Sequence, residues 1–219
     1  MAFRVLKVLL AAALPAMGGC NYAAYLLYLV APGEDSGQTV KAEYEGLAGH
    51  SLAIVVYADQ KVQYEYPLAR EHISRSIASR LQSDEVRKKI KDLRIVEPTK
   101  VLSYQEEHIS WDTMDKTELG RVFGADLVLY VTLVEFSTRE PGSVHLYRGI
   151  ITAEASLYKT ALAEPDSRVW KSDDIRVIYP EDSPSGVSAA NDLLIRRNTV
   201  WLFADRLVKR FYKHTETLK

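Results

Sequence analysis

The sequence predicts an α+β protein in which a mixed β-sheet is covered by helices and a long amphipathic helix lies at the C-terminal end. Three observations carry this prediction. Residues 51–59, "SLAIVVYAD", form a nearly uninterrupted apolar run, as in a strand buried on both faces. Residues 126–138 and 146–158 are two β-rich segments joined by a turn that contains glycine. Between residues 188 and 214, apolar residues recur at spacings of three and four.

The composition fits one folded domain with an anchoring segment. The chain has 219 residues, of which 47% are hydrophobic and 26% charged, close to the average of globular proteins. Because 28 Lys and Arg residues are balanced by 29 Asp and Glu residues, the formal charge of -1 predicts no nucleic-acid partner. The single cysteine excludes an internal disulfide and a zinc site made of several thiolates.

The first twenty residues have the order of an export signal. Arg4 and Lys7 precede a short apolar run, which ends in Met17 and the pair Gly18-Gly19 directly before Cys20. This order resembles bacterial lipoprotein signal peptides, in which a large aliphatic residue stands three positions before an obligatory cysteine; here Met17 stands where Leu is usual. The resemblance implies cleavage after the glycine pair and attachment of acyl chains to Cys20, which would anchor the protein to membrane lipid.

An uncleaved membrane helix is the alternative interpretation. No charge occurs between Lys7 and Glu34, and an apolar run of this length could span a bilayer. Pro15, the glycine pair and Asn21 fall in the middle of that run, where helix propensity and apolarity are poorest. Free secretion is a further alternative, and after cleavage residues 22–31, "YAAYLLYLVA", could lie among the lipid headgroups. Positive charges precede the apolar run and acidic residues follow it. Whether the anchor is lipid or a membrane helix, this order predicts that the rest of the chain crosses the membrane.

Three regions follow from these observations. We expect a signal peptide at residues 1–19, a lipid-anchored and partly apolar tether at residues 20–49, and a single α/β envelope domain at residues 50–219. The end of the tether is rich in Gly and charged residues and shows no apolar period. We therefore expect the protein in the bacterial envelope, anchored in a membrane and facing the periplasm. The choice of inner or outer membrane and the oligomeric state do not follow from the sequence.

The first part of the domain predicts a strand followed by helices. The strand at residues 51–59 is expected to extend through Tyr64 to Tyr66. Pro67 then suits the first residue of a helix whose apolar face is formed by Leu68, Ile73, Ile77 and Leu81. Residues 84–93 predict a second short helix or a continuation of the first. Residues 94–104 predict a strand that Pro98 interrupts or places at a sheet edge.

A capped helix and a hairpin are expected next. Asp115 and Glu118 have the spacing of a capping box at the start of a helix, with Asp in place of Ser or Thr. Gly124 is expected to end that helix. The strand at residues 126–138 then pairs with residues 146–158 in a β-hairpin.

The last segments predict a layer of strands under a helix. The second hairpin strand carries small residues on its apolar face, among them Gly149, which predicts close packing of a helix. Residues 168–180 predict another strand pair or one long irregular strand. The final helix is expected to bury an apolar stripe that includes the aromatic residues Trp201, Phe203 and Phe211.

Two of these segments, "SLAIVVYAD" and "LGRVFGADLVLYVTLVEF", also carry a resemblance. The stretch from Ser51 to Thr138 resembles a group of bacterial envelope proteins. This group includes the curli-secretion channel lipoproteins, the lipoprotein activators of penicillin-binding proteins and the amino-terminal domain of the Tol-system propeller protein. In them a first strand and helix precede a short helix, a Gly-Ala-Asp turn and a central strand. The resemblance implies a shared fold more than a shared function.

No enzymatic motif is found in the sequence. The five histidines form no HExxH pattern, no serine stands in a G-x-S-x-G elbow, and no glycine-rich phosphate loop occurs. We therefore expect no enzyme activity, no cofactor and no metal. Glu106, Glu107, His108 and Asp112 could gather a cation, but a solvated polar loop is the favoured interpretation. An envelope hydrolase that uses polar loop residues is kept as an alternative.

Recognition of other proteins is the function that these observations favour. Trp111 stands in a polar segment, residues 103–114, where a large aromatic either plugs the core or anchors a partner. Trp111 and His108 in this segment, with Tyr147 at the hairpin tip, residues 138–147, are the candidate partner contacts. We expect a noncatalytic lipoprotein that serves as an accessory or assembly subunit of an envelope complex. A transport-complex component with an uncleaved transmembrane helix is the other alternative.

Overall fold

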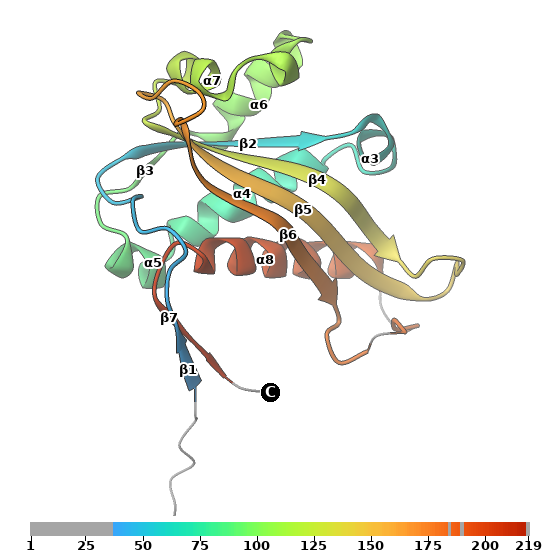
Figure 1. The fold of residues 1–219 in the computed structure, drawn as a ribbon. Coiled ribbons are helices and arrows are strands. Elements are labelled where there is room, and N and C mark those ends of the chain that lie inside the picture. Colours follow the sequence, from blue (N-terminus) through green and yellow to red (C-terminus); the bar gives the residue numbers. More distant parts are fainter. Residues whose placement is uncertain (1–36, 184, 189–190, 218–219) are drawn as a thin grey trace, which may run out of the picture. The chain divides into compact units, whose positions relative to one another are not determined.

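The computed structural model describes residues 37–183, 185–188 and 191–217 (Figure 1). Cys20 and the expected signal peptide lie outside the described residues. The chain divides into two units, of which the larger comprises Lys41–His214 and is called the main unit below. The other unit contains the strand β1 (Gly37–Val40), which pairs with β7 (His214–Thr217) in a two-stranded sheet. Within the described part of the chain, no helix has the length and apolarity needed to cross a membrane.

A five-stranded mixed sheet forms the centre of the main unit. Its strand order is β3-β2-β4-β5-β6, with parallel pairing of β2 to β3 and β4 and antiparallel pairing of β4, β5 and β6. The strands are β2 (Ser51–Ala58), β3 (Arg94–Ile95), β4 (Leu127–Arg139), β5 (Tyr147–Lys159) and β6 (Arg168–Tyr179). The predicted hairpin is β4–β5. This mixed sheet, with helices over it and a long helix near the C-terminus, confirms the predicted α+β fold class.

Two helices, α4 (Ala69–Leu81) and α8 (Asp192–Lys209), cover one face of the sheet. They bury the larger hydrophobic core, to which β4 contributes Leu129 and α8 contributes Phe203. Gly149 of β5 lies directly against α8, because a Cβ atom added there would be only 1.7 Å from Thr199 Oγ1. The predicted close packing of a helix on this strand is therefore confirmed.

Shorter helices cover the opposite face over β2 and the first half of β4 (Figure 1). These are α6 (Pro98–Glu107), the 3-10 helix η2 (Trp111–Thr113) and α7 (Lys116–Phe123). They form a second, smaller core whose buried members are Ala53, Val55, Val101, Trp111, Leu119, Phe123, Ala125 and Val128. The central strand β4 is thus buried on both faces at its beginning, as its uninterrupted apolar sequence predicts.

The ends of α7 agree with the sequence signals. The Asp115 carboxylate accepts hydrogen bonds from the backbone N–H groups of Thr117 at 2.7 Å and Glu118 at 3.4 Å. Gly124 ends the helix with φ 65°, in the left-handed region that favours glycine. Both predicted end signals of this helix are confirmed.

Two expected strand segments are helical instead. Residues 94–104 contain only the two-residue strand β3, and Pro98 is the first residue of α6. Proline suits that position because its missing N–H would have no partner within the helix and its φ is already helical. Tyr64 lies in the short helix α3 (Gln60–Glu65), so the first strand ends earlier than predicted. The following helix α4 begins at Ala69, after Pro67, and the predicted short helix α5 is confirmed at Asp84–Lys89.

The structure also decides the predictions for the end of the tether, for residues 168–180 and for Trp201. Residues 41–49, expected in the tether, belong to the main unit and bury Leu47 in its core. Residues 168–179 form the single irregular strand β6, which confirms one of the two alternatives for this segment.

The prediction that Trp201 lies in the core is wrong, because this side chain is 57% exposed. Trp201 lies about 100° around α8 from Val200, and the sheet covers only the side that carries Val200, Phe203 and Leu207.

Candidate functional site

Trp111 lies in the core. Its side chain is 6% exposed and belongs to the smaller core, with ring centroids 6.1 Å from Tyr57 and 6.4 Å from Tyr130. The 3-10 helix η2 turns the indole inward between α6 and α7. Of the two roles left open for Trp111, the structure shows the core role, and the indole offers no exposed anchor for a partner.

His108 lies at the surface beside Trp111. Its ring stacks on Tyr104 with centroids 3.9 Å apart, and its Nδ1 is 3.0 Å from the Tyr104 carbonyl oxygen. The neighbouring Ile109 is 95% exposed. The segment expected to be a polar loop is thus the end of α6 followed by η2, and its exposed apolar side chain is Ile109. A partner contact at His108 stays a prediction.

Tyr147 is partly buried at the start of β5, near the hairpin tip. The Arg139 guanidinium lies 4.9 Å from the centre of the Tyr147 ring, and Arg139 Nη1 donates to the Val144 carbonyl oxygen at 2.7 Å. Backbone hydrogen bonds of 3.0 Å in both directions join Tyr147 to Val187. These contacts hold the tip in place, with Val144 71% exposed. The predicted contact region at the hairpin therefore presents an apolar side chain to solvent.

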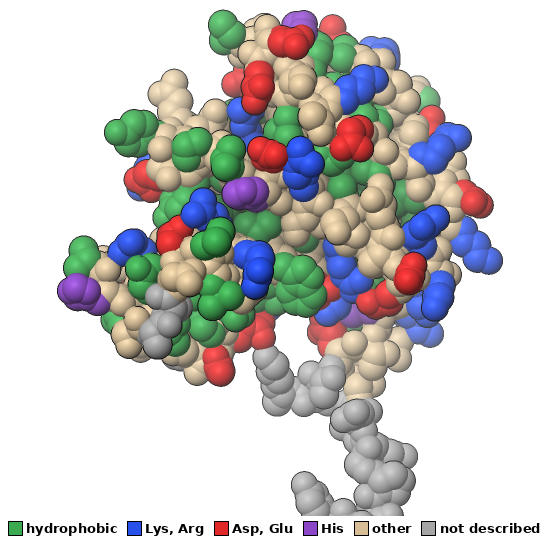
Figure 2. All heavy atoms as spheres, turned by 180° about the vertical axis from the view of Figure 1, so that it is seen from behind, with side chains coloured by type: hydrophobic (Ala, Val, Ile, Leu, Met, Phe, Trp, Pro, Cys, Tyr) green, Lys and Arg blue, Asp and Glu red, His purple; other side chains and the backbone are tan. Residues whose placement is uncertain are grey.

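Several elements carry exposed apolar side chains at the end of the main unit that includes this tip. We call this region the apolar end, defined by Tyr64, Leu68, Val144, Leu193 and Leu194. They come from α3, from the residue before α4, from the hairpin and from the first turn of α8. Figure 2 shows hydrophobic side chains at this end, along the left margin of the view. Trp201 lies two turns further along α8.

Short polar contacts join the segments of the apolar end. The Tyr66 hydroxyl accepts a hydrogen bond from the Thr138 backbone N–H at 3.2 Å and lies 3.3 Å from the Thr138 hydroxyl. That hydroxyl also donates to the Asp192 carboxylate at the first residue of α8. These contacts thus connect the end of α3, β4 and the start of α8, which are far apart in the sequence.

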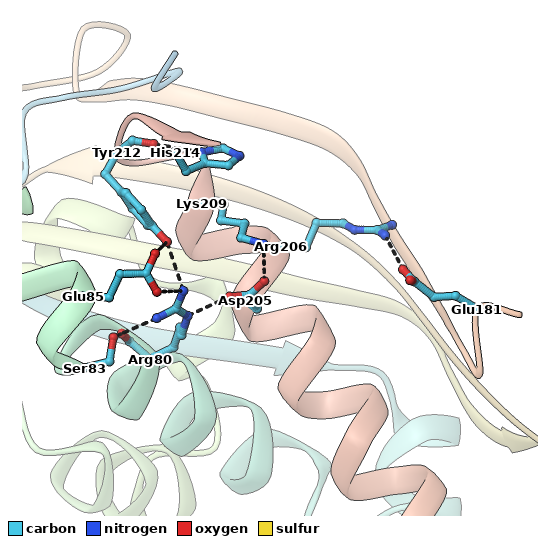
Figure 3. A network of polar contacts seen from close by, with 9 residues as sticks. All are labelled: Arg80, Ser83, Glu85, Glu181, Asp205, Arg206, Lys209, Tyr212 and His214. Carbon is cyan, nitrogen blue, oxygen red and sulfur yellow. Dashed lines mark hydrogen bonds and ion pairs between the residues drawn. The ribbon is translucent and has the colours of Figure 1, made fainter. Parts of the chain in front are cut away.

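The opposite end of the main unit is held by an ionic network (Figure 3). Arg80 donates from Nε to Asp205 at 2.7 Å and from Nη2 to Glu85 at 2.8 Å. It also donates to the hydroxyls of Ser83 at 2.8 Å and Tyr212 at 3.0 Å. Lys209 pairs with the second Asp205 oxygen at 2.7 Å. Arg80 and Asp205 are largely buried, and the network ties α4 and α5 to α8 and the segment that follows it.

The protonation states suit this network. The hydrogen bond from Arg80 holds the pKa of Glu85 below its usual value, so that Glu85 is a carboxylate at neutral pH. Burial raises the pKa of Tyr212 to about 12, so its phenol keeps its proton. That proton is donated to Glu85 Oε1 at 3.1 Å. Because the charges are paired with one another, this network has a structural role. We call it the clasp, formed by Arg80, Ser83, Glu85, Asp205, Lys209 and Tyr212.

The residues considered for a cation do not form a site. Glu106, Glu107 and His108 are exposed at the end of α6, and Asp112 lies in η2. Among the described residues, no group of three or more His, Cys, Asp or Glu side chains is placed to hold a metal ion.

The apolar end could hardly be predicted from sequence patterns. Leu193 and Leu194 match the apolar spacing of a buried helix, yet Leu193 is 69% exposed. They follow the N-cap Asn191 directly, whose side chain accepts from the Leu194 N–H at 2.8 Å. A sequence can indicate that α8 begins here, but it does not indicate whether another element covers the first turn of this helix.

No protein-family model and no curated protein matches the sequence. Among solved structures, a PelC dodecamer from Paraburkholderia phytofirmans is similar with a TM-score of 0.44 and 12% identity, covering 78% of this chain and 96% of that one. Lipoprotein GNA1162 from Neisseria meningitidis follows with a TM-score of 0.42 and 17% identity, over 66% of this chain and 89% of that one. The LpoB C-terminal domain from Salmonella enterica has a TM-score of 0.36 and 11% identity, over 62% of this chain and 87% of that one. Of these three solved structures, that of GNA1162 is described as a lipoprotein.

Proposed function

We propose that this chain is a noncatalytic lipoprotein of the bacterial envelope, anchored to membrane lipid through Cys20 and facing the periplasm. In this proposal it acts as an accessory or assembly subunit that binds a protein partner. The order of Arg4, Lys7, an apolar run and Met17-Gly18-Gly19-Cys20 supports the anchor. Acyl chains at Cys20 would keep the main unit at a membrane surface.

The observation that carries the binding role is the apolar end. Isolated exposed apolar side chains are ordinary on protein surfaces, whereas a group of them at one place marks a site of interaction. Here the group stands on ordered elements, because the Tyr66–Thr138–Asp192 contacts fix α3, β4 and α8 against one another. The aromatic and aliphatic side chains Tyr64, Leu193 and Val144 would fill apolar surface on a partner protein.

The binding role is tested by a double substitution, Val144→Asp with Leu193→Asp. Both side chains are exposed, so we expect the melting temperature to be unchanged. The wild type is crosslinked in membranes and purified with its partner in detergent. We expect the double variant to lose this partner. Ile109→Asp with Leu162→Asp is the matched control, because it places the same two charges at exposed apolar positions outside the apolar end. If the double variant and the control retain the same partner equally, the apolar end is not the binding surface.

The anchor is tested separately by metabolic labelling with a fatty-acid analogue. We expect the wild type to carry the label and to lose its signal peptide. Cys20→Ala should carry no label and keep its signal peptide. An unlabelled and uncleaved wild type that remains in the membrane would instead support the transmembrane alternative.

A further inference from the structure

Five exposed basic side chains gather around α5 and the turn that follows it. We call them the basic end; they are Arg87, Lys88, Lys89, Lys91 and Arg94. Figure 2 shows Lys and Arg side chains along the right margin, where α5 lies after the half-turn from Figure 1. Within the described part of the chain, the first four have no carboxylate within 4.0 Å. This end therefore carries a local positive charge although the whole chain has a formal charge of -1.

Arg94 is only weakly paired. Its Nη2 lies 3.9 Å from Asp126 Oδ2, and both side chains are largely exposed. The same Asp126 oxygen accepts hydrogen bonds from the Ser51 N–H at 2.8 Å and the Ser51 hydroxyl at 2.7 Å. Asp126 is thus committed to Ser51, and the Arg94 guanidinium remains able to bind another anion.

The positions of three of these cations point to a ligand. Arg87, Lys88 and Lys89 fall in the last turn of α5, where positive charge complements the helix carbonyls. Lys91 and Arg94 lie beyond the helix, and together with Arg87 they line an open hollow of about 640 Å³. The other lining residues are Leu81, Gln82, Ile90, Asp92, Leu93 and Ile95, so that Asp92 is the single acid among them.

Strand geometry also predicts backbone donors at this hollow. The N–H groups of Arg94 and Val96 donate to His50 and Leu52 of the neighbouring chain segment at 3.0 and 2.9 Å. Successive N–H groups of a strand point to opposite sides, so those of Leu93 and Ile95 point away from β2 toward the free edge of the sheet. Both residues line the hollow. Guanidinium, ammonium and backbone N–H donors in one place form the chemistry that binds phosphate oxygens.

The first residues of the main unit run beside the basic end. Glu43 accepts hydrogen bonds from Arg210 at 2.5 Å and from the Trp170 indole at 3.0 Å. A few residues later, the Gly49 N–H donates to the Lys91 carbonyl oxygen at 3.0 Å. An early segment of the main unit therefore contacts the basic end at Gly49.

We propose that the basic end binds the phosphate groups of anionic phospholipids in the membrane that holds the anchor. This inference rests on the proposed membrane attachment. Acyl chains at Cys20 would hold the chain at the membrane without fixing the orientation of the main unit, and a polybasic surface is attracted to anionic headgroups. The contact would hold the main unit in one orientation, with Arg87, Lys91 and Arg94 toward the lipid headgroups.

The test uses the full chain purified from membranes in detergent and reconstituted into vesicles. Hydrogen exchange of the amides from Arg87 to Ile95 is compared in phosphatidylcholine vesicles with and without phosphatidylglycerol. We expect exchange to slow by about tenfold or more only when the anionic lipid is present, since each basic side chain near the surface adds to the attraction. The triple variant Arg87→Glu, Lys91→Glu, Arg94→Glu should lose this protection.

A matched triple variant, Lys100→Glu, Arg121→Glu, Arg168→Glu, changes the net charge equally at exposed positions elsewhere and should keep the protection. Equal exchange in the two kinds of vesicle would overturn the proposal, as would equal loss in both triple variants. Protection produced by inorganic phosphate added to neutral vesicles would assign the hollow to a soluble anion instead. Protection of Leu193 and Leu194 in place of residues 87–95 would assign the membrane contact to the apolar end.

These outcomes are separable from the outcome of fatty-acid labelling. The reconstituted chain is held in the vesicle by acyl chains or by an uncleaved apolar segment, so the exchange measurement can be made in either case. A labelled protein without anionic-lipid protection would overturn this inference and leave the proposed anchor intact.

Discussion

The apolar end and the basic end of the main unit are held together in different ways. At the apolar end, Tyr66, Thr138 and Asp192 join three segments through short hydrogen bonds. At the basic end, Arg80 joins α4 and α5 to α8 through a network of paired charges. In both cases the polar groups are satisfied inside the protein. The exposed side chains include Tyr64, Val144 and Leu193 at one end and Arg87, Lys88 and Lys91 at the other.

Both ends are linked by α4 and α8, which run in the same direction. The segment just before α4 is connected through Thr138 to the first residue of α8, and Arg80 near the end of α4 pairs with Asp205 in the second half of α8. Both helices therefore start at the apolar end and finish at the basic end. Cations in their last turns, such as Arg80 and Lys209, complement the helix carbonyls there.

Breaking the clasp at the basic end should have the largest effect on stability. Asp205→Ala leaves the largely buried Arg80 without one of its charged partners, and we expect the free energy of unfolding to fall by about 3–5 kcal/mol. Denaturant unfolding measures this loss. Glu71→Ala is the control, because its pair with Arg75 is exposed and should contribute less than about 1 kcal/mol. Equal stability of the two variants would show that the clasp does not hold the basic end.

A substitution in the shared core tests whether the two ends unfold together. Leu129 is fully buried in the larger core, and Leu129→Ala should cost about 2–5 kcal/mol through lost apolar burial and the cavity left behind. Hydrogen exchange should then accelerate at both ends by the same factor, since one cooperative unit loses stability as a whole. Val134→Ala in the same strand removes an exposed side chain and serves as the control. Acceleration at one end alone would contradict a single cooperative unit.

Tyr66→Phe should have a smaller effect, centred on the apolar end. It removes the hydroxyl that accepts from the buried Thr138 N–H, and an unpaired buried donor costs about 1–3 kcal/mol. We expect faster exchange at residues 137–139 and an intact clasp around Arg80. Tyr64→Phe removes the same hydroxyl two residues earlier on an exposed side chain, and it should change nothing. Identical behaviour of the two variants would mean that the contact does not organise this end.

The smallest expected effect is the pH dependence of the clasp. The hydrogen bond from Arg80 lowers the pKa of Glu85 from its ordinary value of 4.5. This contribution to stability is complete above pH 4.5 and is lost as the pH falls through the lower folded-state pKa. Glu85→Gln should therefore lose less stability than the wild type on acidification, by up to about 1 kcal/mol for so exposed a pair.

Thermal unfolding across the acidic range measures the difference. Glu107→Gln, an exposed position at the end of α6, is the control and should follow the wild-type pH profile. A Glu85→Gln profile that matches the wild type would show that ionisation of Glu85 does not contribute to the clasp.

Local pattern in the sequence determined most of the elements. The apolar run of β2, the hairpin β4–β5, the Asp115 cap, the Gly124 end and the long helix α8 each depend on residues within a few positions of one another. Lipid attachment at Cys20 likewise depends on adjacent residues alone, and it stays a prediction. Pro98 shows the limit of such reasoning, because proline suits both a sheet edge and a first helical turn.

The tertiary structure alone decided which side chains are covered. Trp111 in a polar segment is buried because α6 and α7 close over it, and Trp201 in an apolar stripe is exposed because α8 meets the sheet with its other side. The side chains of the apolar end likewise come from segments far apart in the chain, whereas the hollow of the basic end is lined by residues between Leu81 and Ile95 alone. Periodicity reports which faces of an element are apolar. Burial depends on which other elements lie against those faces, and this is fixed by packing across the whole unit.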